Sequence, residues 1–187
     1  MATIHDARGT AAERPTTTRA APTPARGAVA VRYVTAALRI VFGWTFLWAF
    51  LDKLFGLGYA TPEAKSWLNG GSPTKGFLSS ATGPFEGFYH DIAGTGWANW
   101  LFMLGLVAIG TAFLLGIGTR IAAAAGTVMY LMMWSVHLPP ETNPVVDEHI
   151  IGALAMVLLA LLVAGDTIGL GRWWKSLPIV QRNPWLI

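Results

Sequence analysis

The 187-residue chain contains no cysteine. This absence excludes disulfide bonds, thiol redox chemistry, iron–sulfur ligation and covalent attachment of a c-type haem by this chain alone. Any redox function would therefore require a bound quinone, another cofactor or a partner subunit.

Charged residues are also scarce. They make up 12% of the chain and hydrophobic residues 53%, whereas about 25% of a typical soluble domain is charged. A soluble domain of this size could not bury so much apolar surface, and the length suits one compact bundle. The net charge of +3 comes from cations spread over termini and loops, so it does not indicate a nucleic-acid groove.

The start of the chain has few large apolar residues. Residues 1–29 are rich in Ala, Thr, Pro and Arg. Such a segment cannot offset the entropy of ordering by burial, so we expect a disordered cytoplasmic tail. The apolar region that follows the basic start of a signal peptide is missing.

Long apolar runs dominate the rest of the sequence. Four stretches are long enough to suggest membrane crossings, at residues 31–55, 97–117, 121–138 and 150–169. We therefore predict an all-α membrane protein with a four-helix transmembrane bundle at residues 30–171 and a cytoplasmic C-terminal tail at residues 172–187. Buried helices of a soluble protein are the alternative, but four in so short a chain disfavour it.

Arginine and lysine gather on one side of the predicted bundle. Five arginines precede or begin the first span, Arg120 separates the second and third, and three cations follow the fourth. The only lysine or arginine residues in the other two loops are Lys65 and Lys75. The positive-inside rule then places both termini in the cytoplasm and the bundle in the plasma membrane.

The loop at residues 56–96 is long for a small bundle, so we expect it to be partly helical. Thr61-Pro62-Glu63 is typical of a helix start, with Thr61 as the N-cap. A second short helix is predicted after Gly83-Pro84. One face of that helix would carry Phe85, Phe88, Tyr89 and Ile92, and this stripe would either lie on the outer leaflet or cap the bundle.

A charged residue within an apolar span often marks function, because burying charge in hydrocarbon is unfavourable. Arg39 shares one helix face with Gly43, Phe46, Phe50 and Lys53. Two cations, aromatic rings and a small residue would suit an anion or a quinone carbonyl. The alternative is a structural Arg39 that pairs with Asp166, since a buried arginine needs a partner.

Polar residues from three helix ends meet on the predicted outer side. They are Asp52, Lys53, His137, Asp147, Glu148 and His149. Such groups could relay protons, handle substrate or bind a metal, although polar residues at helix ends are ordinary. No HExxH or comparable ligand spacing is present, so we predict no metal, and a surface position disfavours the histidines as haem ligands.

Several motifs resemble a known family. The first-helix signature of DoxX/DoxD membrane proteins is similar to Arg39-Ile40-Val41-Phe42-Gly43 and Phe50-Leu51-Asp52-Lys53-Leu54. The turn between the family's second and third helices is similar to Gly116-Ile117-Gly118-Thr119-Arg120-Ile121-Ala122. The long loop with Gly70-Gly71-Ser72-Pro73 resembles that of the DoxD-like branch of the family. Members of this branch are often labelled as a thiosulfate:quinone oxidoreductase subunit. The likeness covers about residues 31–174. Many DoxX relatives carry a glutamate in the second helix, whereas residues 100–115 contain no acid.

The resemblance implies electron transfer from thiosulfate to a membrane quinone, yielding tetrathionate, together with a second redox subunit or a further copy of the chain. On this interpretation Arg39 orients the quinone, Lys53 attracts the sulfur oxyanion, and a histidine moves protons. We therefore predict an integral membrane subunit of a quinone-linked oxidoreductase. Its predicted catalytic residues are Arg39, Lys53, His137 and His149, and its predicted quinone-binding residues are Arg39, Gly43, Phe46 and Phe50.

Two other functions are weighed against this one. A non-catalytic scaffold or anchor for a redox partner needs only the packing surfaces and a structural Arg39. A small-solute carrier is disfavoured, because no span is broken in its middle by Gly or Pro and no half-repeat is evident.

Overall fold

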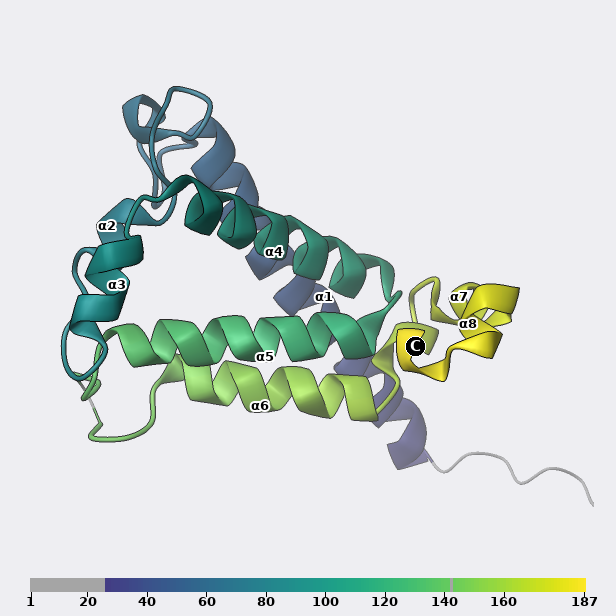
Figure 1. Cartoon of the computed structure of the whole chain (residues 1–187). Coiled ribbons are helices and arrows are strands. Elements are labelled where there is room, and N and C mark those ends of the chain that lie inside the picture. Colours follow the sequence, from purple (N-terminus) through teal and green to yellow (C-terminus); the bar gives the residue numbers. More distant parts are fainter. Residues whose placement is uncertain (1–25, 142) are drawn as a thin grey trace, which may run out of the picture.

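The computed structural model describes residues 26–141 and 143–187, and residues 1–25 of the predicted tail lie outside them. Four long helices form the body of this part (Figure 1): α1 (Arg26–Phe55), α4 (Gly96–Leu115), α5 (Thr119–Val136) and α6 (Glu148–Leu161). Within these residues there is no β-strand beyond one isolated bridge between Thr82 and His137, which confirms the predicted all-α class. Residues 26–29, predicted as tail, belong to α1.

Short helices fill the segments at the two ends of the bundle. Between α1 and α4 lie η1 (Glu63–Lys65), α2 (Lys75–Leu78) and α3 (Glu86–Ile92). After α6 follow η2 (Ala164–Asp166), α7 (Gly171–Ser176), α8 (Pro178–Arg182) and η3 (Pro184–Leu186). We call the end with the first set and residues 137–141 and 143–147 the loop end. The end with the second set and the turn at residues 116–118 is the Arg39 end.

The segment between α1 and α4 is partly helical, as the sequence predicts. The Tyr89 side chain of α3 is 4% exposed, and its hydroxyl lies 2.5 Å from Ser135 Oγ of α5. This contact makes α3 a cap on the end of α5. The other predicted helix is only a single 3-10 turn with Pro62 as N-cap instead of Thr61, because the chain becomes extended at Ser66 and then bonds back to α1.

The bundle is built from two helix pairs. α4 packs along α1, and α5 packs along α6. Figure 1 shows α4 and α5 meeting at the turn that joins them and diverging toward the loop end. Two glycines bring α1 and α4 together, because a Cβ at Gly43 would lie 2.7 Å from Leu114 N and one at Gly110 would lie 2.6 Å from Leu47 N. The two backbones are therefore in close contact.

α6 is shorter than the predicted fourth span. Its 14 residues extend about 21 Å, less than the hydrocarbon core of about 30 Å. The helix ends at Leu161 because the chain turns at Val163, with φ of 51°, and Gly165 then packs on Gly116. Among the described helices, α1 and α4 are long and apolar enough to cross a membrane, so the count of four spans stays a prediction.

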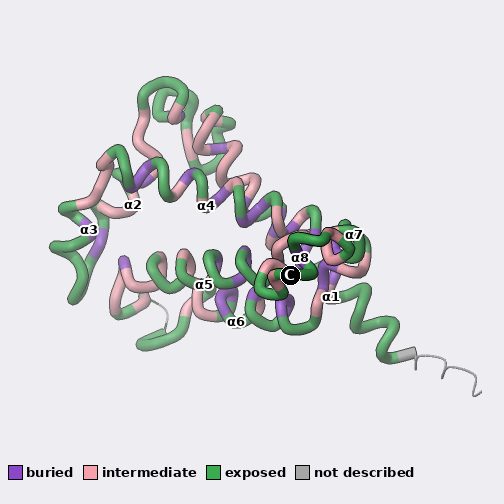
Figure 2. Tube along the Cα trace, turned by 45° about the vertical axis from the view of Figure 1, so that its right-hand side comes forward, coloured by how far each residue is buried: buried purple, intermediate pink, exposed green. Residues whose placement is uncertain are grey.

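The outer surface of the bundle is strongly apolar. Figure 2 shows exposed residues recurring along the outside of the long helices. On α6 these residues lie at helical spacing and are 51–74% exposed: Ile151, Leu154, Leu158 and Leu161. Soluble monomers rarely expose a contiguous apolar face of this kind, so the surface is suited to lipid.

Candidate functional site

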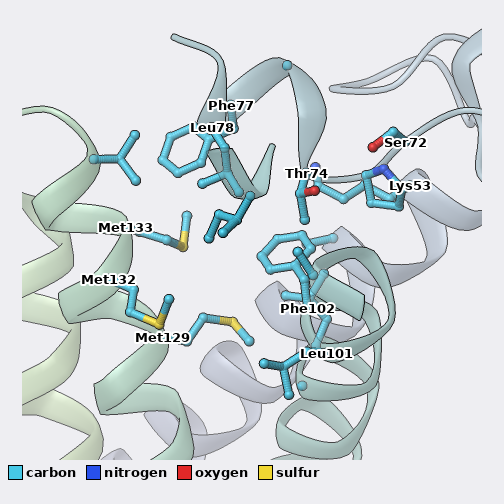
Figure 3. A pocket seen from close by; sticks show the side chains of 18 of the residues that line it. Lys53, Ser72, Thr74, Phe77, Leu78, Leu101, Phe102, Met129, Met132 and Met133 are labelled. Carbon is cyan, nitrogen blue, oxygen red and sulfur yellow. The ribbon is translucent and has the colours of Figure 1, made fainter. Parts of the chain in front are cut away.

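A large cavity lies between α4 and α5, where the two helices diverge toward the loop end. Its volume is about 970 Å³, near the upper limit of the roughly 300–1,000 Å³ typical of ligand pockets. Its lining comes from α1, the loop segment, α4 and α5. Figure 3 shows the side chains that converge on this space.

The walls of the cavity are apolar. Lining residues recur every three or four positions on both helices, so α4 and α5 each turn an apolar stripe toward the other. The α4 stripe includes Leu101, Phe102 and Gly105, and the α5 stripe includes Met129, Met132 and Met133 (Figure 3). Methionine side chains are flexible and polarizable, so this wall can adapt to an apolar ligand.

The polar end of the cavity lies beside the loop segment, where Lys53, Ser72 and Thr74 line it (Figure 3). The neighbouring Asp52 carboxylate accepts hydrogen bonds from the backbone amides of Tyr59 (3.2 Å) and Ala60 (3.1 Å). It is therefore engaged in holding the loop. Across residues 26–141 and 143–187, no carboxylate forms an ion pair with Lys53, so the ammonium group is available to a ligand.

Asn99 fixes the segment that closes the polar end. Its side chain is buried, and its Oδ1 accepts hydrogen bonds from the hydroxyls of Ser72 (2.9 Å) and Thr74 (2.7 Å). Its Nδ2 donates to the carbonyl of Gly94 at 3.4 Å. Sequence reasoning missed Asn99, although a carboxamide within an apolar helix was a signal that could have found it.

Arg39 lies away from the cavity, fully buried at the opposite end of the bundle. Its Nη1 donates to the carbonyls of Phe113 and Leu114, the latter at 3.0 Å, and its Nη2 donates to the carbonyl of Ile168 at 2.6 Å. The last carbonyls of a helix have no partner within that helix. Arg39 therefore satisfies the C-terminal turn of α4 and joins α1, α4 and the segment after α6.

The predicted pairing of Arg39 with Asp166 is wrong. Asp166 Oδ2 lies 2.7 Å from Lys175 Nζ, and Arg39 uses carbonyl oxygens instead. Glycines bring these carbonyls together, since a Cβ at Gly116 would lie 2.9 Å from both Arg39 Nη1 and Gly165 Cα. The turns after α4 and α6 thus pack directly against the guanidinium group.

The four predicted quinone-binding residues on α1 make packing or hydrogen-bonding contacts within the bundle, and none of them lines the cavity. Gly43 contacts α4, and Phe46 and Phe50 pack in the hydrophobic core. Of the predicted site residues on α1, Lys53 is the one that lines the cavity. It lies fourteen positions after Arg39, a distance of about 21 Å along the helix axis, so the two cations do not form one site.

The two predicted histidines lie at the loop end in different surroundings. His137 Nε2 lies 3.3 Å from Ser80 Oγ, and its ring packs on Phe77, which lines the cavity. His149 Nδ1 lies 2.8 Å from Asp147 Oδ2 at the start of α6. Neither histidine lines the cavity, but His137 packs on a residue that does.

Asp147 is the N-cap of α6. Its Oδ1 accepts hydrogen bonds from the amides of His149 (3.0 Å) and Ile150 (3.3 Å). Burial raises the pKa of Asp147, but the bonds from the His149 ring and the two amides outweigh it, so the pKa lies below its ordinary value. Asp147, Glu148 and His149 offer ligand atoms within 4.8 Å of one another, yet helix capping already accounts for this arrangement.

Comparison with known proteins identifies one family. A family model described as DoxX matches residues 34–138, more than half of the 187 residues. The matched range includes the Arg39–Gly43 segment, the Gly116–Ala122 turn and both walls of the cavity. No curated protein and no solved structure matches the chain.

Proposed function

The chain belongs to the DoxX family, and from this premise we propose that it binds a membrane quinone between α4 and α5, as the membrane subunit of a quinone-linked oxidoreductase. The observation that carries the proposal is the apolar cavity of about 970 Å³ with Lys53 at its polar end. Two apolar helices of spanning length and the exposed apolar face of α6 support a membrane protein, in which lipid-soluble ligands are at hand.

The cavity suits the chemistry of a quinone. Its aliphatic and aromatic walls can hold a ring and an isoprenoid chain, while a quinone carbonyl needs a hydrogen-bond donor. The hydroxyls of Ser72 and Thr74 already donate to Asn99. The Lys53 ammonium is thus the donor best placed to bind and orient the carbonyl.

Lys53 and Lys65 both line the cavity and add positive charge to its rim. A dianion such as thiosulfate would be attracted to this charge, more strongly where water is excluded. Two thiosulfates that join through a new S–S bond release two electrons. A bound quinone accepts two electrons and two protons, and His137 beside Phe77 could pass those protons.

A second redox subunit is part of this proposal. The chain has no cysteine, and so no thiol or iron–sulfur centre of its own can carry the electrons. We place both termini in the cytoplasm of a plasma-membrane protein, from the distribution of arginine and lysine. The loop end, with Lys53, would then receive the sulfur donor from outside the cell.

Quinone binding is tested with the purified protein in nanodiscs. Ala125→Trp puts a large ring into the cavity, whereas Leu158→Trp adds a comparable ring on the outer face of α6 as a control. We expect the dissociation constant of a soluble ubiquinone analogue to rise at least tenfold in Ala125→Trp and to stay unchanged in Leu158→Trp. Equal affinity in both folded variants would reject this site.

Redox function is tested separately, by thiosulfate-dependent reduction of the quinone with any co-purifying subunit present. Lys53→Met removes the charge at the polar end, and Lys175→Met is the control because it lies at the Arg39 end. The proposal expects a loss of turnover in Lys53→Met alone. Binding without turnover in the intact complex would reject thiosulfate as the donor.

A non-catalytic scaffold is the second candidate. It is favoured by Arg39, whose guanidinium joins three segments through backbone carbonyls and does not line the cavity between α4 and α5. A scaffold would co-purify with a redox partner, and Ala125→Trp would leave that partner's activity intact. Loss of activity with retained assembly would instead favour the quinone site.

A further inference from the structure

A second, smaller cavity lies at the Arg39 end, remote from the proposed quinone site. Its volume is about 170 Å³, and it lies between the first turns of α1 and the segment that follows η2. Six residues line it: Val29, Arg32, Tyr33, Thr167, Ile168 and Arg172. Two of these six are arginines from segments far apart in the sequence.

Both guanidinium groups are oriented through Nε. Arg32 Nε donates to Thr167 Oγ1 at 3.4 Å, and Arg172 Nε donates to the carbonyl of Asp166 at 3.2 Å. These bonds use one N–H of each side chain. Within the part of the chain that the structure describes, the terminal amino groups of both arginines form no hydrogen bond. Two such groups on one planar guanidinium match the oxygens of a phosphate.

The charge of these arginines is not neutralised within residues 26–141 and 143–187. No carboxylate there forms an ion pair with Arg32 or Arg172. Asp166, the acidic residue nearest to Arg172 in the sequence, is paired with Lys175 at 2.7 Å. A small cavity with two unopposed cations attracts an anion.

The rim of this cavity is apolar. Val29, Tyr33 and Ile168 are 37%, 57% and 59% exposed, so three large side chains surround the two arginines. Ile168 has φ of 51°, an unusual conformation for a β-branched residue. The acyl chains of a lipid can pack against these apolar side chains, whereas a free phosphate has no apolar group to contact them.

We propose that Arg32 and Arg172 bind the phosphate of an anionic phospholipid at the Arg39 end. The phosphate oxygens contact the terminal amino groups of the two arginines, and the acyl chains lie along the apolar surface of α1. Lipids of this charge attract arginine near a membrane surface. The inference does not depend on quinone binding, because the two cavities share no residue.

The test is native mass spectrometry of the full chain in detergent, titrated with phosphatidylglycerol, with phosphatidylcholine or with inorganic phosphate. Arg32→Gln and Arg172→Gln each remove one guanidinium from the cavity. Arg182→Gln is the matched control, since Arg182 lies at the same end on α8 and does not line the cavity. Arg32→Lys keeps the charge but loses the planar fork.

We expect each cavity variant to weaken phosphatidylglycerol binding about tenfold, with Arg32→Lys intermediate and Arg182→Gln unchanged. Melting temperatures without lipid should match the parent protein, because both arginines are exposed. Equal losses in Arg182→Gln would overturn the proposal in favour of nonspecific attraction. Inorganic phosphate that binds as tightly as phosphatidylglycerol would overturn the lipid as ligand and assign the site to free phosphate.

Discussion

α4 meets its two neighbours in different ways. Toward α1 it presents Gly110, where a Cβ would lie 2.6 Å from the backbone nitrogen of Leu47. Toward α5 it presents Gly105, where a Cβ would meet only the flexible end of Met129, at 2.5 Å. The first face is a close backbone contact, and the second borders a cavity of about 970 Å³.

The two ends of the bundle also differ in packing, since one is tightly packed and the other borders the cavity. At the Arg39 end, glycines draw the turns after α4 and α6 onto one buried guanidinium, whose bonds are to carbonyls. At the loop end, Asn99 holds a segment over an open space, and Lys53 has no ion-pair partner in the described part of the chain. A buried charge in an apolar helix is thus a structural element here. The candidate site lies between α4 and α5, where the two helices do not pack against each other.

The largest expected effect comes from Arg39→Met, which tests whether the Arg39 end is structural. Three carbonyls would lose a charged donor, and we expect a loss of more than about 3 kcal/mol in unfolding free energy. Thermal unfolding in detergent measures this. A folded Arg39→Met of normal stability that no longer binds quinone would show that Arg39 is a ligand and not a structural residue.

The two glycines of α4 test its two faces within one helix. Gly110→Ala forces a Cβ onto the α1 backbone, so we expect about 1–3 kcal/mol of destabilisation. Gly105→Ala displaces only a methionine end and gains helix propensity, so its unfolding free energy should change by less than about 0.5 kcal/mol. Similar melting temperatures for both variants would mean that the α1–α4 contact is not tight.

Asp147→Ala removes the N-cap of α6 at the loop end. A loss of about 1 kcal/mol is expected at neutral pH. The folded-state pKa of Asp147 lies below the unfolded value of about 3.9. Its contribution is therefore present above that pH and is lost as the pH falls through the folded-state pKa. Chemical unfolding at several pH values should show the difference between parent and variant shrinking below about pH 4, and a constant difference would contradict the capping role.

The smallest effect is expected for Lys175→Met. The pair between Lys175 and Asp166 is about one-third exposed on each side, at 29% and 32%, and such pairs contribute about 0–1 kcal/mol. The variant should melt within a few degrees of the parent protein, and the shift should decrease further in high salt. A loss as large as that of Arg39→Met would show that the Arg39 end depends on this pair.

The helices and their order could be predicted from the sequence, because long apolar runs and the Gly116–Arg120 turn are local signals. The end of α6 at Leu161 could not be predicted from the sequence. Hydropathy continues past Leu161, and the helix stops because of a contact between Gly165 and Gly116, which are distant in sequence. Hydropathy reports where a chain is apolar but not where it turns.

The candidate site was predictable only in part. Lys53 stood out as a charge at the end of an apolar span, and it lines the cavity. The partners of Arg39 left no signal, because every residue carries a carbonyl. The cavity exists because the apolar faces of α4 and α5 do not pack against each other. No residue type in the sequence indicates such a gap.

Quinone binding between α4 and α5 can be mapped by photolabelling with an azido-quinone in nanodiscs, followed by peptide mapping. We predict labels on residues that line the cavity, within 97–109 of α4 and 121–136 of α5, and protection of both by excess unlabelled quinone. Labels confined to the surroundings of Arg39, around residues 113–116 and 168, would contradict the account. They would place the quinone at the end of the bundle where Arg39 bonds to backbone carbonyls.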